Sequence, residues 1–257
     1  MRILLVRHGQ SRSNVDASEN VRVADHAIAL SEEGEAQARQ CGQFIAGWLD
    51  AHAITDGTPP RLAAVRLWHS PYLRTRQTAA ILEAHCRLQR DVLVTGDRGP
   101  RAAGDSCFID RKEHVLLAEQ QFGIFDGLSD AEREARYPDF HAYYEKCKRF
   151  EGKLWPKMPL GESRFEVCQR VHQSFGTFQR DAARHGIETI VVVGHGTTNR
   201  AFVMMWLHLP YEWMHEEPNP GNCSVRLIED GEDRGYVFDG FANPEAYLRA
   251  PTKETEE

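Results

Sequence analysis

A length of 257 residues fits one large domain or two small ones. Hydrophobic residues make up 41% of the chain and charged residues 27%, a globular composition that argues against disorder throughout. The 31 basic and 38 acidic residues give a formal net charge of −7. This charge disfavours a broad surface for nucleic acid and allows only a local cluster of positive charge.

The sequence predicts neither export nor membrane insertion. The apolar run near the start, residues 3–6, is too short for a signal peptide. The longest apolar stretch, residues 201–207, has seven residues, whereas a membrane span needs about 20. We therefore expect a cytoplasmic protein. Its cysteines are scattered and form no CxxC pair, so free thiols are expected at Cys41, Cys86, Cys107, Cys147, Cys168 and Cys223.

The predicted elements alternate between strands and helices along the chain. Short apolar runs predict buried strands at residues 3–6, 64–68 and 190–193. Helix starts are predicted at residues 31–34, at Ser70-Pro71 as N-cap and first helical residue, and at residue 163, where an amphipathic pattern extends to residue 184. This alternation predicts an α/β fold, a three-layer α/β/α sandwich around a mostly parallel sheet.

Residues 125–160 interrupt that alternation. The stretch is rich in Tyr, Phe, Lys and Glu and is broken by prolines. We expect a mainly helical cap subdomain inserted in a single domain of residues 1–250. Its aromatic residues either pack a small core or line the mouth of a pocket: Tyr143, Tyr144 and Trp155. Loops are predicted at residues 54–62 and 96–106, and a flexible tail at 251–257.

Histidines and arginines follow the predicted strands where the strands end. The chain reads Arg7-His8-Gly9 after the first strand, His69-Ser70 with Arg74 a turn later after the second, and Gly194-His195-Gly196 after the third. Open α/β sheets bind ligands outside the carboxyl ends of their strands. We therefore expect these residues to converge: Arg7, His8, Arg74 and His195.

The residue types in this cluster indicate which ligand it takes. Catalytic zinc usually needs three protein ligands, and arginines repel cations, so a metal site is disfavoured. Guanidinium groups instead match the geometry of tetrahedral oxyanions. The cluster therefore predicts a phosphate site with a histidine nucleophile and no metal.

A series of motifs, in a fixed order along the chain, carries a family resemblance. They are Leu5-Val6-Arg7-His8-Gly9-Gln10-Ser11 with Asn14, Leu30-Ser31-Glu32-Glu33-Gly34, Ser70-Pro71-Tyr72-Leu73-Arg74, Glu119 with Phe122-Gly123, Gly161-Glu162-Ser163, Val193-Gly194-His195-Gly196 and Asn222-Cys223-Ser224. Together they resemble the histidine phosphatase superfamily, also called the phosphoglycerate mutase-like family. The resemblance covers roughly residues 2–228.

The resemblance implies a role for each matching residue. His8 would be the nucleophile and carry a phosphohistidine. Glu119 would protonate the leaving alkoxide and then activate water. The phosphoryl oxygens would be held by Arg7, Asn14, Arg74, His195 and Thr197. Glu162 would either orient an arginine or cap the long helix. The implied function is that of a metal-independent phosphatase without a cofactor, which releases inorganic phosphate from a small phosphorylated metabolite and binds neither nucleic acid nor membrane.

Departures from the family pattern leave other functions open. The mutase-type Arg-His-Tyr after the acid is replaced by Gln120-Gln121-Phe122, and Ala118 stands where an arginine often precedes the glutamate. These changes favour hydrolysis over a bisphosphoglycerate-dependent mutase. The alternatives are that mutase and a non-catalytic phosphate-binding module. A basic set either receives a second anionic group or lies in a solvated loop: Arg98, Arg101, Arg111 and Lys112.

Overall fold

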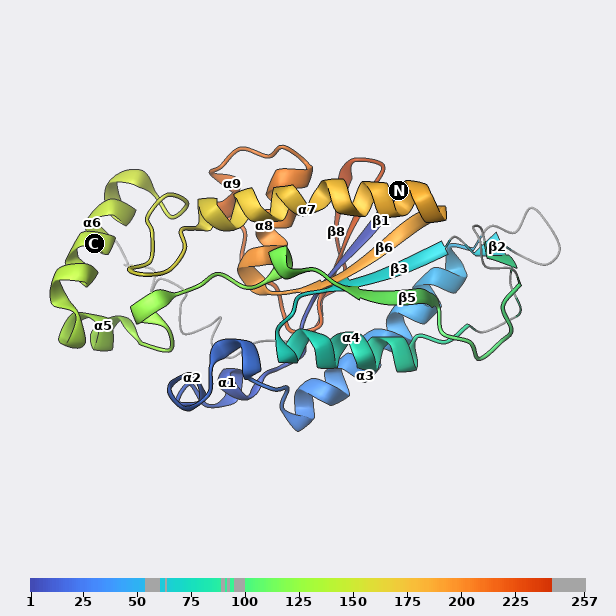
Figure 1. Cartoon of the computed structure of the whole chain (residues 1–257), viewed down its shortest axis with the longest axis horizontal. Coiled ribbons are helices and arrows are strands. Elements are labelled where there is room, and N and C mark those ends of the chain that lie inside the picture. The colour runs from blue at the N-terminus through green and yellow to red at the C-terminus, as the bar shows by residue number, and fades with distance from the viewer. Residues whose placement is uncertain (54–60, 63, 89–90, 92, 95–99, 242–257) are drawn as a thin grey trace, which may run out of the picture.

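The computed structural model describes residues 1–53, 61–62, 64–88, 91, 93–94 and 100–241 (Figure 1). A six-stranded sheet runs in the order β5-β3-β6-β1-β7-β8. Its strands are β1 (Arg2–Arg7), β3 (Ala64–His69), β5 (Phe108–Glu113), β6 (Ile187–Gly194), β7 (Val225–Glu229) and β8 (Glu232–Phe238). The first four of these run parallel, and β7 and β8 join as an antiparallel edge. The predicted mostly parallel sheet is confirmed.

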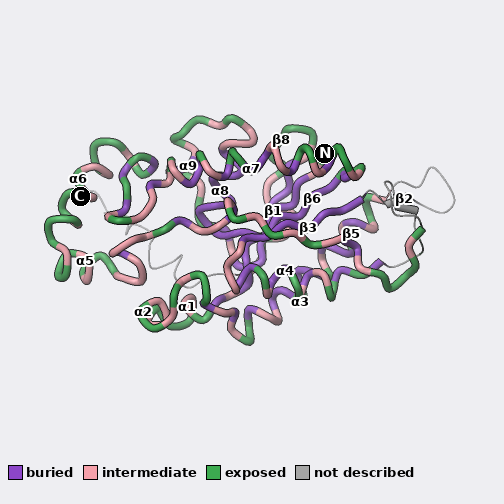
Figure 2. Tube along the Cα trace, in the orientation of Figure 1, coloured by how far each residue is buried: buried purple, intermediate pink, exposed green. Residues whose placement is uncertain are grey.

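Helices cover both faces of this sheet, as Figure 1 shows. One face packs against α3 (Glu32–Ala51) and α4 (Leu73–His85), the other against α7 (Arg164–His185) and α8 (Gly196–Trp206). Side chains alternate along a strand, so Leu4 and Val6 of β1 enter the first core and Ile3 and Leu5 the second. Figure 2 shows the central strands β1, β3 and β6 mainly buried. The α/β/α sandwich is therefore confirmed.

Two of the three predicted helix starts are confirmed, and the third is wrong. Ser31 caps α3 by accepting a hydrogen bond from the Gly34 N–H, and α7 begins after Ser163, which forms a capping box with Glu166. The prediction at Ser70-Pro71 is wrong, because α4 begins at Leu73 with Tyr72 as its N-cap. The Ser70 hydroxyl is instead hydrogen-bonded to His195, 125 residues further along the chain.

The strands missed by the sequence analysis carry charges that find partners only in the folded chain. On β5, Lys112 pairs with Asp181 at 2.6 Å, and Asp110 pairs with the buried Arg66. The basic set predicted as an anion site or solvated loop is corrected here. Arg111 and Lys112 lie on β5 in ion pairs, Arg101 donates to the Phe108 carbonyl, and Arg98 lies outside the described residues.

The inserted region is mainly helical, as predicted, with α5 (Asp130–Arg136) and α6 (Pro138–Glu151) at one end of the molecule (Figure 1). Tyr144 packs edge-on against Phe125, with ring centroids 5.9 Å apart, and so contributes to a small core. Tyr143 is exposed, and Trp155 lies at the surface against Phe165 and Tyr211.

Shorter elements complete the described chain. They are α1 (Arg12–Val15), α2 (Glu19–Arg22), β2 (Arg61–Leu62), β4 (Leu93–Val94), α9 (Trp213–Glu216) and 3-10 helices at Asp25–Ala27, Val115–Leu117 and Gly123–Phe125. β2 pairs with β4, which corrects the end of the predicted 54–62 loop. Residues 54–60, 95–99 and the predicted tail at 251–257 lie outside the described ranges.

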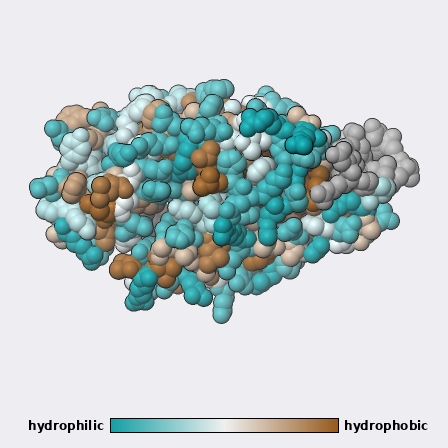
Figure 3. All heavy atoms as spheres, viewed as in Figure 1, coloured by the Kyte–Doolittle hydropathy of each residue, from teal (hydrophilic) through white to brown (hydrophobic). Residues whose placement is uncertain are grey.

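Two general surface properties bear on the predictions. The face of the molecule in Figure 3 is mainly hydrophilic, with separate hydrophobic patches. Within the described ranges, no helix has both the length and the apolar character needed to cross a bilayer.

All six cysteines are free thiols, and only Cys147 is not fully buried.

Two glycines let the chain after β1 lie directly on the start of α3. A Cβ added to Gly9 would come within 2.4 Å of the Gly34 carbonyl oxygen, and one added to Gly34 within 2.0 Å of the Gln10 carbonyl oxygen. Both distances are far below van der Waals contact with backbone atoms that have little freedom to move. This backbone contact fixes the strand end that carries His8.

We predict that Gly34→Ala destabilises the protein by roughly 3 kcal/mol, because the added methyl group overpacks two backbone segments. Gly47→Ala is the matched control on the same helix, since a Cβ there meets nothing within 4 Å. That control should stabilise the protein by about 0.5–1 kcal/mol through helix propensity. Urea unfolding of both variants measures the two effects. If the two variants had similar free energies of unfolding, the backbone contact at Gly34 would accommodate a methyl group without destabilising the fold.

Candidate functional site

The carboxyl ends of β1, β3 and β6 meet at one edge of the sheet and bring the predicted histidines together. His8 follows β1 and His195 follows β6, and their ring centroids lie 5.3 Å apart in an edge-to-face arrangement. Both rings are buried, with 4% and 0% of their surface exposed. β1 and β6 are paired in register from Arg2 to Arg7, so neighbouring strands place the two residues side by side.

The His8 ring is held in one tautomer. Its Nδ1 lies 2.7 Å from the Gly9 carbonyl oxygen. A carbonyl only accepts, so Nδ1 carries the proton and Nε2 carries the lone pair. Burial, then the guanidinium groups of Arg74 and Arg7, lowers the pKa of His8 well below its ordinary value. The ring is therefore neutral, with Nε2 available as a nucleophile.

His195 is the N-cap residue of α8 and has a different set of contacts. Its Nε2 lies 2.8 Å from the Ser70 hydroxyl, and its ring packs edge-on against the Tyr72 ring at 5.0 Å. Burial lowers the pKa of His195 well below its ordinary value, and the nearby Arg74 adds to this effect. Ser70 was missed as a site residue, although it follows a strand end just as the two histidines do.

Both predicted arginines are buried beside the histidines. Arg7 donates from Nη1 to the Pro220 carbonyl at 2.6 Å. Arg74 donates from Nη1 to the Asp25 carbonyl at 2.6 Å and to the Asp25 carboxylate at 2.8 Å, and its guanidinium lies 4.9 Å from the centre of the Tyr72 ring. No sequence pattern pointed to Asp25, because it reaches Arg74 from a short 3-10 helix 49 residues upstream.

Asn14 lies beside the end of β1 rather than in a loose loop. Its Oδ1 accepts from the Ser11 N–H at 3.1 Å and from Asn222 Nδ2 at 3.5 Å. The same Asn222 amide donates to the His8 carbonyl at 3.1 Å, and the Cys223 N–H donates to the Arg7 carbonyl at 3.0 Å. The predicted Asn222-Cys223-Ser224 motif thus supports the backbone of the two residues on either side of the strand end.

Glu119 lies at the N-terminus of α8, close to the histidine pair. Its Oε2 accepts from the Thr197 N–H at 3.3 Å, and its Oε1 accepts from the Thr198 N–H at 3.3 Å and from the Thr198 hydroxyl at 3.1 Å. The N-terminus of a helix favours a negative charge. Thr197, which the resemblance assigns to the phosphoryl oxygens, therefore uses its backbone N–H to bind the Glu119 carboxylate.

The two alternatives for Glu162 are now resolved. The capping box of α7 is formed by Ser163 and Glu166, which rules out the capping alternative. Glu162 instead pairs with Arg170 on α7, with Oε1 2.8 Å from the arginine Nε. The alternative that Glu162 orients an arginine is confirmed. Arg170 itself was not singled out from the sequence.

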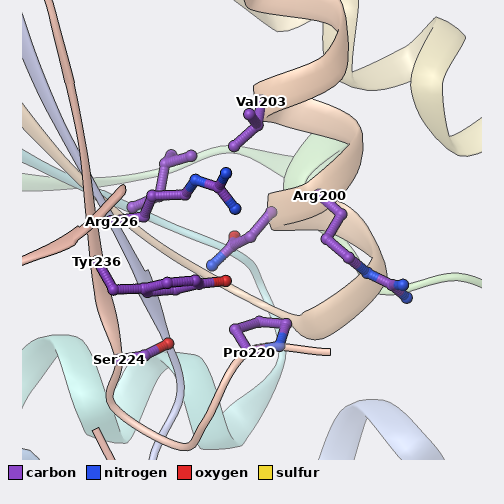
Figure 4. A pocket seen from close by; sticks show the side chains of 8 residues that line it. Arg200, Val203, Pro220, Ser224, Arg226 and Tyr236 are labelled. Carbon is purple, nitrogen blue, oxygen red and sulfur yellow. The ribbon is translucent and has the colours of Figure 1, made fainter. Parts of the chain in front are cut away.

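A separate hollow lies between α8 and the antiparallel strands β7 and β8 (Figure 4). In it, Arg226 lies over Tyr236 and is ion-paired with Glu217 and Asp233, while Arg200 donates to the Gly196 and Glu217 carbonyls. Its lining includes neither histidine of the pair. Because both of its arginines are already bound by protein groups, we place the candidate site at the strand ends.

Among the residues that the structure describes, no three His, Cys, Asp or Glu side chains gather closely enough to hold a metal ion. The predicted site residues that do gather are the cationic and histidine groups at the sheet edge, with Glu119 beside them.

The chain is similar in sequence to several known proteins. The chain is 30% identical to a phosphoglycerate mutase-like protein of Arabidopsis thaliana, over 92% of this chain and 76% of that protein. It is 24% identical to a broad-range acid phosphatase of Saccharomyces cerevisiae, over 88% and 84% of the two chains. It is 29% identical to a 2,3-bisphosphoglycerate-dependent phosphoglycerate mutase of Gloeobacter violaceus, over 82% and 77%.

Solved structures share the fold. A mycobacterial glucosyl-3-phosphoglycerate phosphatase superposes with a TM-score of 0.61 and 20% identity, covering 93% of this chain and 98% of that one. The sequence model of the histidine phosphatase superfamily (branch 1) matches residues 3–94 and 101–241. With the motifs converging at one sheet edge, this match shows that the chain belongs to branch 1 of the histidine phosphatase superfamily.

Proposed function

We propose that the protein is a phosphomonoesterase that transfers the phosphoryl group of a small phosphorylated metabolite to His8 Nε2 and then to water. The observation that carries the proposal is the His8 ring, which is buried, neutral and bonded through Nδ1 to the Gly9 carbonyl. This arrangement leaves Nε2 as the nucleophilic atom beside two guanidinium groups. The similarity to a broad-range acid phosphatase supports hydrolysis.

The proposed reaction has two steps. In the first, Nε2 of His8 forms a bond to phosphorus, the ester P–O bond breaks, and protonated Glu119 gives its proton to the leaving oxygen. In the second, the Glu119 carboxylate takes a proton from water as the water oxygen attacks phosphorus. The P–N bond breaks, inorganic phosphate leaves, and the free enzyme is restored.

The remaining site residues would bind the phosphoryl group. Arg7 and Arg74 lie close enough to His8 to lower its pKa, and their positive charge would offset the charge on the phosphoryl oxygens in place of a metal. His195 would contact the same oxygens. Asn14 and the Thr197 hydroxyl are the proposed neutral contacts, since the Thr197 N–H holds Glu119. This protein would act in the cytoplasm on a soluble ester rather than on nucleic acid or membrane.

A bisphosphoglycerate-dependent mutase is the second candidate, favoured by the named mutase among the relatives. The residues after Glu119 favour hydrolysis. Gln120 occupies the position of the arginine in the mutase-type Arg-His-Tyr. Its neutral side chain is buried and donates from Nε2 to the Glu162 carbonyl at 2.9 Å, so it offers no positive charge to a second anionic group. Isomerisation of phosphoglycerate stimulated by bisphosphoglycerate would support the mutase, and release of inorganic phosphate would support the phosphatase.

We predict that His8→Ala lowers phosphatase activity by at least about 10³-fold, because the nucleophile is removed. It should also abolish acid-labile labelling of the protein by a phosphorylated substrate. His69→Gln is the control, since His69 is the last residue of β3 and also bonds its neighbour's carbonyl through Nδ1, but lies among Arg111, Glu113 and Arg76. Labelling in the His8 variant would contradict the assignment. Tight phosphate binding without turnover in the wild type would favour a non-catalytic module.

We predict that Arg74→Met raises the pKa of His8, because the guanidinium disfavours the protonated ring. The pKa should stay below its ordinary value, since burial is the larger cause. Titration of the ring nitrogens by ¹H–¹⁵N NMR measures this shift. Arg76→Met is the control, because Arg76 lies on the same helix but pairs with Glu113 at the surface. An unchanged His8 pKa in Arg74→Met would show that the Arg74 charge does not act on the His8 ring.

We predict that Glu119→Gln slows phosphoryl transfer according to the leaving group. For an alkyl phosphate, kcat/KM should fall by about 10²–10⁴-fold, the usual contribution of general acid catalysis. For p-nitrophenyl phosphate the fall should be less than about tenfold, because p-nitrophenolate leaves without a proton. Equal losses for both substrates would argue against the acid role of Glu119.

A further inference from the structure

Arg170, on the first half of α7, directs its guanidinium group at the segment that carries Glu119. Nη1 donates to the Leu116 carbonyl at 2.8 Å and to the Ala118 carbonyl at 2.7 Å, and Nη2 donates to the Glu119 carbonyl at 3.0 Å. The other two donors go to Glu162, from Nε at 2.8 Å and from Nη2 at 3.0 Å. All five N–H donors of the guanidinium are therefore used.

Glu162 fixes the same segment from its other end. Its Oε2 accepts from the Gln121 N–H at 3.0 Å, its backbone carbonyl accepts from Gln120 Nε2 at 2.9 Å, and its own N–H donates to the Gln121 carbonyl at 2.8 Å. The Glu162 and Arg170 side chains are 19% and 16% exposed. A mostly buried bidentate pair of this kind holds one geometry.

The segment from Ala118 to Gln121 has no regular structure of its own to set the direction of Glu119. It follows a single 3-10 turn, Val115–Leu117, that packs against α7. On the α8 side, the Thr198 hydroxyl contacts both the Ala118 carbonyl at 2.8 Å and the Glu119 carboxylate at 3.1 Å. The Glu119 backbone is thus bound to α7 through Arg170, and its carboxylate is bound to α8 and to the neighbouring Gln120 N–H at 2.9 Å.

We propose that Arg170, held by Glu162, is a positioning residue that directs the Glu119 carboxylate at the leaving group. This inference rests on the proposed function, since it concerns the acid of that reaction. An arginine suits the task because its planar fork reaches three carbonyls and a carboxylate at once, whereas a lysine has three donors on one nitrogen. Arg170 is also one of the cations that lower the pKa of His195, which places it near the reacting groups.

The test compares two substrates in Arg170→Gln, Arg170→Lys and Glu162→Gln. We expect Arg170→Gln to lower kcat/KM for an alkyl phosphate by about 10–100-fold, part of the contribution of general acid catalysis, and for p-nitrophenyl phosphate by less than about threefold. Loss of structure would instead lower the active fraction and affect both substrates equally. Arg170→Lys and Glu162→Gln should show smaller losses with the same selectivity.

A matched control comes from an ion pair at the start of α7, between a residue that precedes the helix and one in its first turn. Lys157 pairs with Glu166 at 2.6 Å in an exposed ion pair that does not touch the Glu119 segment. Lys157→Gln should leave kcat/KM unchanged for both substrates. If Arg170→Gln does not fold, Glu162→Gln decides, because it keeps the arginine bonds to the three carbonyls.

The outcomes separate this inference from the proposed function. If Glu119→Gln itself shows no dependence on the leaving group, the acid role fails and the proposal for Arg170 fails with it. If Glu119→Gln is selective for the alkyl phosphate but the folded Arg170 and Glu162 variants lower both substrates equally, only the positioning role is overturned. Selectivity shared by all of these variants supports both.

Discussion

The site depends on a histidine that stays neutral while cations surround it. Burial and two guanidinium groups disfavour the protonated His8 ring, and the Gly9 carbonyl fixes the proton on Nδ1. Each effect alone is common, but together they leave one nitrogen lone pair in a positively charged environment. This environment suits the proposed transfer of a phosphoryl group to nitrogen, which requires an anion-binding site with a free lone pair.

Much of the surrounding structure serves to hold that ring in place. Gly9 and Gly34 allow the chain after β1 to lie against the start of α3, and Asn222 supports the His8 carbonyl from the opposite side. Ser70 binds the second histidine from the end of β3. These contacts come from the carboxyl ends of β1 and β3 and from the segment before the antiparallel β7. A sheet that brings these strand ends to one edge is the framework of the site.

The sequence was sufficient for the features that local patterns encode. Apolar runs predicted β1, β3 and β6, and the Ser163 start with its amphipathic pattern predicted α7. It failed at β5, because the charged residues of this strand show no strand pattern in the sequence. Their ion-pair partners lie on α7 and β3. It failed again at Ser70-Pro71, a good helix start by composition, because a distant histidine takes the serine hydroxyl.

By itself, the sequence determined the fold class and the chemistry at the strand ends, because strand periodicity and residue type are local properties. It placed His8, His195, Arg7 and Arg74 together by the rule for open sheets. Only the tertiary structure decided that Asp25 holds Arg74, that Glu119 lies at the N-terminus of α8 and that Arg170 binds its backbone. Those contacts join residues 49 to 79 positions apart, and their geometry exists only once the helices have packed on the sheet.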